Sequence, residues 1–394
     1  MADWRRGVKG SSTIWSGPAR WTTGGRSQRR RGYAAPRTVR EARERRRWGG
    51  AMSARSSARR PRIVDVAKAA GVSAQTVSNV INGRRGFTEP TRLRVERAIA
   101  ELDFQPNRYA QSLRSRRTGL IGFDMVRRQL DISNPFTVGL LHALVPAATH
   151  HDRRVLVFTH DENRPEEFRA TAAAGLVDGF ILSDSTAGDP RARVLEEQGV
   201  PYVVMGRPDM GPTVAALDID NAVAMHEAVE HVLAQGCRDV AYVGYSQPAH
   251  WNVERRRGVR EALRHHGIGL PRHRVLTGAS LPSIKGRLPE FLTRHGVPDA
   301  VVTSSDSIAV GVVAIAQVLG IAVGTDMAVT GFDDSPLASM VSPEITSISV
   351  PVEPIAERLL DLLDLVLDGG LLPAGETVAT RLVVRGSSGF GRVS

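Results

Sequence analysis

RIVDVAKAAGVSAQTVSNVIN, residues 62–82, contains two short apolar-periodic segments separated only by Gly-Val-Ser. Four apolar residues of the first segment fall on one helix face: Ile63, Val66, Ala67 and Ala70. Gly71 can adopt the left-handed conformation that ends a helix, and Ser73 is a favoured cap for the next one. The pattern therefore predicts two short helices at a sharp angle, a helix-turn-helix.

The second predicted helix buries Val77, Val80 and Ile81 and so turns a polar face outward. This outward face holds Ala74, Gln75, Ser78, Asn79 and Asn82. Gln and Asn can bond an adenine edge bidentately, and Ser can contact a base or a phosphate. Arg84 and Arg85 follow at once, placed to meet phosphates. The alternative is an ordinary helical hairpin with a polar outer face.

A third helix is expected shortly after the motif. Thr88 is a candidate cap for it, and Phe104 follows its end. Its inward residues are Val95, Ala98, Ile99 and Leu102. Three short helices in so few residues predict a compact, all-α unit.

Charge is distributed unevenly along the 394 residues. The formal net charge is +11, but residues 1–60 carry 17 Lys and Arg residues against three acidic ones, and residues 61–117 carry 11 against five. These two segments hold net charges of +14 and +6, which leaves −9 for the remainder. A cationic front on an anionic body suggests that only the front meets a polyanion.

Residues 1–60 are rich in Arg, Gly, Ser and Thr and show no sustained helical or strand period. This composition predicts a disordered basic extension. Two interpretations remain open: a nonspecific nucleic-acid arm, or an upstream extension of a protein that starts at Met52.

From Gly119 onward, apolar segments alternate with amphipathic ones, the rhythm of doubly wound α/β layers. Strands are predicted at 120–123, 154–160, 178–183, 201–206, 239–245, 299–304 and 327–332. The length of this region suggests two similar lobes.

Several classes of protein are disfavoured. The single cysteine, Cys237, excludes an internal disulfide framework and is typical of a reducing cytosol. No apolar run has the length of a membrane span, and no secretory signal is recognisable, so we expect a cytoplasmic location. The sequence contains no P-loop, no GxSxG elbow and no Cys/His metal spacing, so we expect neither an enzyme nor a cofactor or metal.

The stretch IVDVAKAAGVSAQTVSNVIN resembles, nearly position for position, the DNA-binding signature of the lactose-repressor (LacI/GalR) family. The resemblance continues through FTEPTRLRVERAIAELDFQPNRYAQSLRS and covers about residues 61–390. It implies an N-terminal all-α helix-turn-helix head and a two-lobed, periplasmic-binding-protein-like α/β body with doubly wound parallel sheets. The implied organisation is a head at 61–106, a hinge helix at 107–117 and a two-lobed effector-binding and dimerisation domain at 118–394.

For DNA, the resemblance makes Ala74, Gln75 and Asn79 the major-groove readers, and Asn79 in place of the family's commoner Arg favours adenine over guanine. The full set of DNA-binding candidates is Ala74, Gln75, Thr76, Ser78, Asn79, Asn82, Arg84, Arg108, Leu113 and Arg114. In the family the hinge helix folds on the operator and inserts a Leu from the minor groove, here Leu113.

For a small molecule between the lobes, the resemblance nominates Asn134, Phe136, Arg207, Arg255, Ser305, Asp306 and Asp333. Arg and Asp at strand ends suit hydroxyl groups, and Phe136 can cover the apolar face of a sugar. Alternatives stay open for three of them. Arg255 lies in a triple-Arg run that suits a solvated face, Asp306 can cap a helix, and Asp333 can be structural.

The resulting expectation is a homodimeric transcriptional regulator, a repressor, that binds palindromic operator DNA and responds to a sugar or sugar-like effector. The segment DMVRRQLDI, 124–132, is longer and more charged than the family's usual loop, so a non-sugar effector that contacts Arg127 and Arg128 remains an alternative. An extracytoplasmic sugar-binding protein is the other alternative, but such a protein needs no DNA-reading head.

Overall fold

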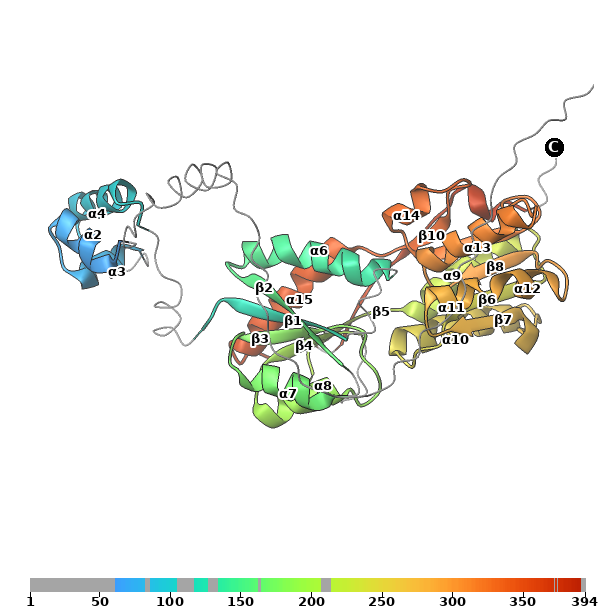
Figure 1. Cartoon of the computed structure of the whole chain (residues 1–394), viewed down its shortest axis with the longest axis horizontal. Helices are drawn as coiled ribbons and strands as arrows, with labels where there is room; N and C mark the ends of the chain where they lie inside the picture. Colours follow the sequence, from blue (N-terminus) through green and yellow to red (C-terminus); the bar gives the residue numbers. More distant parts are fainter. Residues whose placement is uncertain are drawn as a thin grey trace, which may run out of the picture. The chain divides into compact units, whose positions relative to one another are not determined.

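The structure, a computed structural model, describes residues 61–81, 86–104, 117–126, 134–161, 164–206, 214–371, 373 and 375–390. The chain divides into two compact units, residues 1–105 and 106–394 (Figure 1). The expectations for residues 1–60 and for the hinge at 107–116 lie outside the described residues.

The described residues of the first unit form three helices, α2 (Ile63–Ala70), α3 (Ala74–Ile81) and α4 (Glu89–Glu101). Their shared apolar core consists of Val66, Ala67, Ala70, Val77, Val95, Ala98 and Phe104. Gly71 ends α2 with φ 65°, and the Ser73 hydroxyl accepts a hydrogen bond from Thr76 N at 3.1 Å at the start of α3. The predicted trihelical unit and both of these turn residues are confirmed.

Thr88 differs in detail from its expected role. It directly precedes α4 in an extended conformation, but its side chain makes no capping bond to the backbone. The Thr88 hydroxyl instead pairs with the Thr91 hydroxyl at 3.0 Å.

The second unit contains two six-stranded sheets, each with helices on its faces (Figure 1). The first sheet has the order β11-β5-β4-β3-β1-β2. Its strands are β1 (Leu120–Val126), β2 (Arg154–His160), β3 (Gly179–Leu182), β4 (Tyr202–Met205), β5 (Ala216–Ile219) and β11 (Glu376–Val378). The helices of this first lobe are α6 (Pro135–His150), α7 (Pro165–Ala173), α8 (Pro190–Gln198) and α15 (Val352–Leu367).

The sheet of the second lobe has the order β12-β10-β9-β8-β6-β7. Its strands are β6 (Val240–Tyr245), β7 (Val275–Gly278), β8 (Ala300–Thr303), β9 (Ala328–Asp333), β10 (Thr346–Ser349) and β12 (Arg381–Val383). Its helices are α9 (Asn221–Ala234), α10 (His250–His265), α11 (Leu281–Lys285), α12 (Leu288–Thr293), α13 (Asp306–Val318) and α14 (Pro336–Ser339). The pairings within both sheets are parallel except that β12 runs antiparallel to β10.

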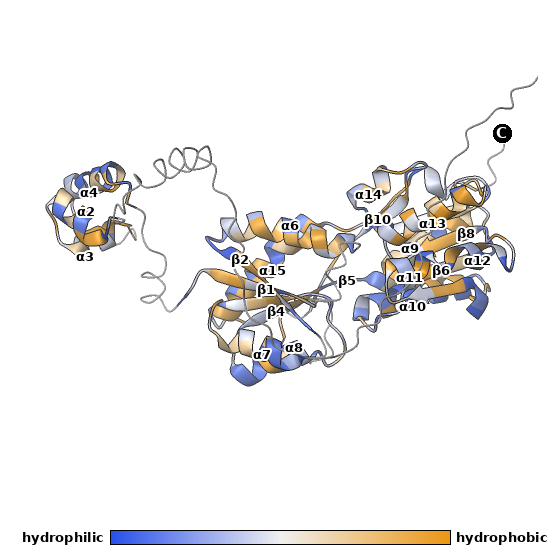
Figure 2. Ribbon diagram, viewed as in Figure 1, coloured by the Kyte–Doolittle hydropathy of each residue, from blue (hydrophilic) through white to orange (hydrophobic). Residues whose placement is uncertain are grey.

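The seven predicted strands correspond to β1, β2, β3, β4, β6, β8 and β9, and the prediction of two doubly wound lobes is confirmed. Figure 2 shows the basis of that prediction: apolar residues concentrate in the strands, while helices such as α7 and α10 carry many hydrophilic residues. Five short strands escaped the sequence pattern because none contains three consecutive apolar residues: β5, β7, β10, β11 and β12.

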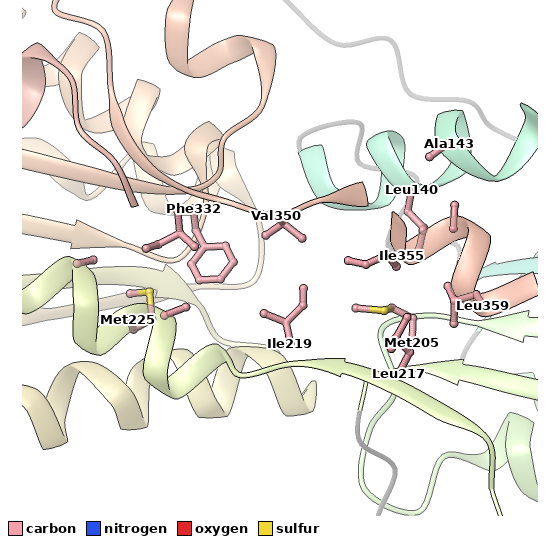
Figure 3. Packing of buried hydrophobic residues seen from close by; sticks show 14 of the residues in the cluster. Leu140, Ala143, Met205, Leu217, Ile219, Met225, Phe332, Val350, Ile355 and Leu359 are labelled. Atoms are coloured by element: carbon pink, nitrogen blue, oxygen red, sulfur yellow. The ribbon is translucent and has the colours of Figure 1, made fainter. Parts of the chain in front are cut away.

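Within the described residues the chain passes between the lobes three times, from β5 to α9, from β10 to α15 and from β11 to β12. A single buried apolar cluster follows these passages, and Figure 3 shows it extending from Leu140 and Leu359 through Ile219 and Val350 to Phe332. The lobes are therefore joined by a packed core as well as by the chain. In folds of this type, ligands bind outside the carboxyl ends of the strands, where the two sheets face one another.

Candidate DNA-reading helix and effector pocket

Helix α3 presents a narrower polar face than the sequence suggested. Gln75 is exposed, and Thr76 and Asn79 are partly exposed. The Gln75 side-chain nitrogen donates to Asn79 Oδ1 at 3.0 Å, so the two candidate base readers lie side by side one turn apart. An amide pair of this kind suits recognition of base edges in the major groove.

Two members of the predicted outward face lie elsewhere. Ser78 is buried, with only 6% of its surface exposed, because it lies beside Val77 on the inner side of α3. Its assignment to the outward face is therefore wrong. Ala74 is partly buried and packs against the apolar core of the head. The remaining DNA-binding candidates lie outside the described residues: Asn82, Arg84, Arg108, Leu113 and Arg114.

In the second unit, a pocket of about 530 Å³, partly open to solvent, lies between the lobes. Five predicted effector residues line it: Asn134, Phe136, Arg255, Ser305 and Asp333. The first lobe also contributes Thr137, Ser183, Asp184, Met205, Gly206, Asp218 and Ile219, and the second contributes Asn221, Tyr245 and Trp251. Carboxylates, amides, hydroxyls and three aromatic rings thus converge on one site.

Arg255 is a pocket residue and not part of a solvated face. It is only 4% exposed, and its guanidinium carbon lies 3.4 Å from the centre of the Phe332 ring and 4.7 Å from that of the Trp251 ring. Arg255 Nε donates to Asn221 Oδ1 at 2.9 Å, and a terminal nitrogen donates to Ser304 O at 2.6 Å. Burial lowers the pKa of this guanidinium, while the neighbouring Asp333 opposes that shift.

Asp333 carries the strongest sign of a binding role. It ends β9 with φ 103°, a backbone conformation that is strained for a residue other than glycine. Both of its carboxylate oxygens are buried and lack a hydrogen-bond partner, and Arg255 lies 3.7 Å away, too far for a hydrogen bond. Burial raises the pKa of Asp333 well above its ordinary value, although Arg255 lowers it. A ligand hydroxyl at this position would satisfy the carboxylate.

Asn134 and Ser305 each begin a helix at the pocket. The Asn134 side chain accepts from Thr137 N at 3.4 Å at the start of α6. Ser305, and not Asp306, is the cap of α13, where its hydroxyl accepts from Ile308 N at 3.5 Å. Both residues combine a structural role with a position at the pocket surface.

Asp306 is fully buried and is not among the lining residues. One carboxylate oxygen accepts from Ser335 N at 2.7 Å and from the Ser335 hydroxyl at 2.9 Å. The other accepts from the Ser347 hydroxyl at 2.6 Å. Burial raises the pKa of Asp306 to about 6, against the lowering effect of these hydrogen bonds. The structure thus places Asp306 behind the pocket as a link between α13, β10 and the segment after β9.

Several pocket residues that the sequence analysis missed lie at or just after the carboxyl end of a strand. Ser183 ends the predicted strand 178–183 and Asp184 directly follows it, whereas Asn221 follows β5, which the pattern did not predict. Nominating each polar residue at a strand's carboxyl end would have found Ser183 and Asp184. Trp251, one residue into α10, had no local signal. Arg207 lies outside the described residues.

The described part of the chain contains no group of three or more His, Cys, Asp or Glu residues arranged to hold a metal ion. Among its helices, none is long and apolar enough to cross a membrane.

Comparison with known proteins identifies the domains that carry these two candidate sites. The model of the bacterial regulatory proteins, lacI family, matches residues 62–107, and that of the periplasmic binding protein-like domain matches residues 229–388. The HTH-type transcriptional regulator CelR of Thermobifida fusca is 33% identical over 335 residues, 84% of this chain and 98% of that protein. A solved transcriptional regulator CelR–cellobiose complex has a TM-score of 0.65 and 31% identity, over 83% of this chain and 100% of that chain.

The lac repressor dimer bound to operator and the anti-inducer ONPF has a TM-score of 0.74 at 24% identity, over 84% of this chain and 99% of that chain, and shows the same fold. A helix-turn-helix head on a two-lobed binding-protein-like body defines a class of DNA-binding transcriptional regulators, which are not enzymes. The chain belongs to the lacI family of bacterial regulatory proteins.

Proposed function

We propose that this regulator is a repressor whose affinity for its operator is controlled by a neutral, polyhydroxylated small molecule bound between the lobes. The observation that carries this proposal is the buried, unpartnered carboxylate of Asp333 beside the Arg255 guanidinium. One hydroxyl can donate to Asp333, and a neighbouring hydroxyl can accept from Arg255. A vicinal diol supplies both groups at the spacing of this pair.

A sugar fits the remaining lining as well. Phe136, Tyr245 and Trp251 offer apolar surfaces that suit the faces of sugar rings, and Asn134 and Ser305 add polar groups. The similar CelR has been solved with cellobiose, which makes a disaccharide a reasonable first candidate. The alternative of an acidic effector depends on Arg127 and Arg128, which lie outside the described residues.

On the DNA side, Gln75 and Asn79 read bases, and Thr76 and the basic residues after α3 contact the backbone. A single head of this size covers one short stretch of major groove, so we propose that a homodimer binds a palindromic operator. Residues 61–106 then form the head, 107–117 the hinge helix and 118–394 the effector-binding and dimerisation domain. Such a protein acts where the DNA is, so we place it in the cytoplasm, at the nucleoid.

The proposal is tested in two steps. Selection of binding sites from a random DNA pool should yield a palindrome, and a thermal-shift screen of cellobiose, other neutral sugars and sugar phosphates should yield stabilising ligands among the neutral sugars. The hit should then change operator affinity in a gel shift. Stabilisation by sugar phosphates alone would contradict the proposed effector class. A selected ligand without any effect on DNA binding would contradict the proposed control.

A further inference from the structure

Three contacts join the lobes directly along one side of the pocket. Thr186 of the first lobe forms an isolated antiparallel bridge with Ala249 of the second. The backbone nitrogen of His250 donates to Ser185 O at 3.2 Å. Next to them, the indole nitrogen of Trp251 donates to the Asp184 carboxylate. The last of these is the only one that uses two side chains, and both side chains line the pocket.

Asp184 is held firmly on its own lobe. It has φ 59° directly after β3, a conformation that Asp and Asn tolerate better than most residues. Behind it, the buried Arg191 donates to Ser183 O at 2.8 Å and to both carboxylate oxygens of Asp189 at 3.1 and 2.8 Å. Arg191 also reaches Asp124 in β1 at 3.4 Å. The segment that carries Asp184 is therefore anchored on each side by one buried guanidinium.

Trp251 connects this contact to the ligand-binding arginine. The Arg255 guanidinium carbon lies 4.7 Å from the centre of the Trp251 ring and 3.4 Å from the centre of the Phe332 ring. Tyr245 meets the Trp251 ring edge-on, with ring centres 6.4 Å apart. The Trp251 ring is therefore one of two aromatic rings that pack against the guanidinium, and its position helps to set the position of Arg255 in the pocket.

We propose that Asp184 is a positioning residue for effector binding. By accepting from the Trp251 indole across the two lobes, it holds that ring near Arg255 and keeps the first lobe's pocket residues opposite Arg255 and Asp333 of the second lobe, so that both lobes contact the same ligand. This inference rests on the proposed function and names a new determinant of it. Without the contact, a smaller fraction of the molecules is in the binding-competent arrangement. The apparent effector affinity falls in proportion to that populated fraction.

The contact can be tested without any effector. Five tryptophans occur in the sequence, and four of them precede the head: Trp4, Trp15, Trp21 and Trp48. In the full chain with these four changed to Phe, fluorescence reports Trp251 alone, and acrylamide quenching measures its accessibility. Asp184→Gly, which removes the carboxylate and tolerates the positive φ, should raise the quenching constant about twofold or more. Asp184→Asn keeps an acceptor oxygen and should restore shielding.

Ser185→Gly is the matched control, because it adds the same backbone freedom one residue away and leaves the indole acceptor in place. Its quenching should equal that of the parent. Equal quenching in Asp184→Gly and the parent would overturn the proposal, as would equal increases in Asp184→Gly and Ser185→Gly, because loop flexibility alone would then explain the change.

The link to Arg255 is tested by calorimetric titration with cellobiose. Asp184→Gly should weaken binding about tenfold, as expected for loss of a hydrogen bond to a charged group. In a Trp251→Phe background, which keeps a ring near Arg255 but has no indole donor, the same substitution should have no further effect. Additive losses would overturn the positioning role. If the parent does not bind cellobiose, the proposed disaccharide is wrong, while the quenching result still decides the role of Asp184.

Discussion

The side chains of Gln75 and Asn79 are hydrogen-bonded to each other at 3.0 Å on the outer face of α3. Each amide therefore fixes the other before DNA is present. We expect Asn79→Ala and Gln75→Ala each to weaken operator binding by about 1–3 kcal/mol and to relax specificity at one base pair. Because the two residues share this contact, their effects should not add.

Binding-site selection with each variant measures this relaxation. Arg84→Ala is the comparison, since a phosphate contact should weaken binding to all sequences alike and lower the salt dependence. An unchanged selection profile for Asn79→Ala would show that Asn79 does not read a base.

Arg255 and Arg257 belong to the same Arg run but occupy opposite environments, which makes them a matched pair. Arg255 is buried at the pocket, whereas Arg257 is exposed and paired with Glu254 and Glu261 along its own helix. Arg255→Ala should abolish the effector response and leave effector-free operator binding intact, with a loss of about 2–3 kcal/mol in effector binding. Arg257→Ala should change both by less than about 0.5 kcal/mol.

Gel shifts with and without effector separate the two variants. A normal effector response in a folded Arg255→Ala protein would remove Arg255 from the binding site.

A substitution in the proposed hinge should affect operator binding and effector binding in the opposite way to Arg255→Ala. In the proposed hinge helix, Leu113 inserts into the minor groove only when the helix is ordered on DNA, so Leu113→Ala should weaken operator binding and reduce its dependence on effector. Effector affinity of the free protein, measured by fluorescence titration, should stay nearly unchanged. By reciprocity, operator DNA should change the effector affinity of the unmodified protein by the same factor as effector changes operator affinity. A Leu113→Ala protein that binds and responds normally would contradict this mechanism.

Asp306 should make stability depend on pH in the opposite sense to an ordinary ion-paired carboxylate. Burial raises its pKa from 3.8 to about 6 in the folded chain, so its favourable contribution is complete below pH 4 and is lost as pH rises through 6. The loss is on the order of 2–3 kcal/mol. Asp306→Asn should remove this component, so the melting temperature of the variant relative to the parent should rise between pH 4 and pH 6.5.

Thermal unfolding across that pH range measures the difference in melting temperature between Asp306→Asn and the parent. Asp326→Asn is the control, because Asp326 is exposed. A constant offset between Asp306→Asn and the parent at every pH would show that the buried carboxyl does not titrate in this range.

The close contact between α9 and α10 depends on Gly258. A Cβ at this position would lie 2.3 Å from Ala222 O and 2.8 Å from Ala222 Cα, and these are backbone atoms that cannot swing aside. Gly258→Ala should therefore cost about 1–3 kcal/mol of stability. It should also weaken effector binding, since α10 carries Trp251 and Arg255.

Gly269→Ala is the control for this substitution, because no atom lies within 4 Å of the added Cβ. Differential scanning fluorimetry of the two variants should show a lower melting temperature only for Gly258→Ala. Equal melting temperatures would mean that the two helices can separate without cost.

The sequence by itself determined the features that depend on neighbours along the chain. Helical spacing, the left-handed turn at Gly71 and the cap at Ser73 specify the head, because each involves residues within one or two turns. Uninterrupted apolar runs identified seven of the strands in the two lobes. Motif resemblance placed Arg255 and Asp333, because their positions relative to a strand end or a glycine are local features.

Only the tertiary structure decided which residues meet across the chain. Ser78 is buried although the helical pattern placed it on the outward face of α3, and Asp306 lies behind the pocket, where Ser335 and Ser347 from later segments bind it. Asp184 and Trp251 lie 67 residues apart, on different lobes, and become partners only where three chain passages bring the lobes together. No periodicity along the sequence records such a contact, because the lobe packing that creates it depends on all of these segments at once.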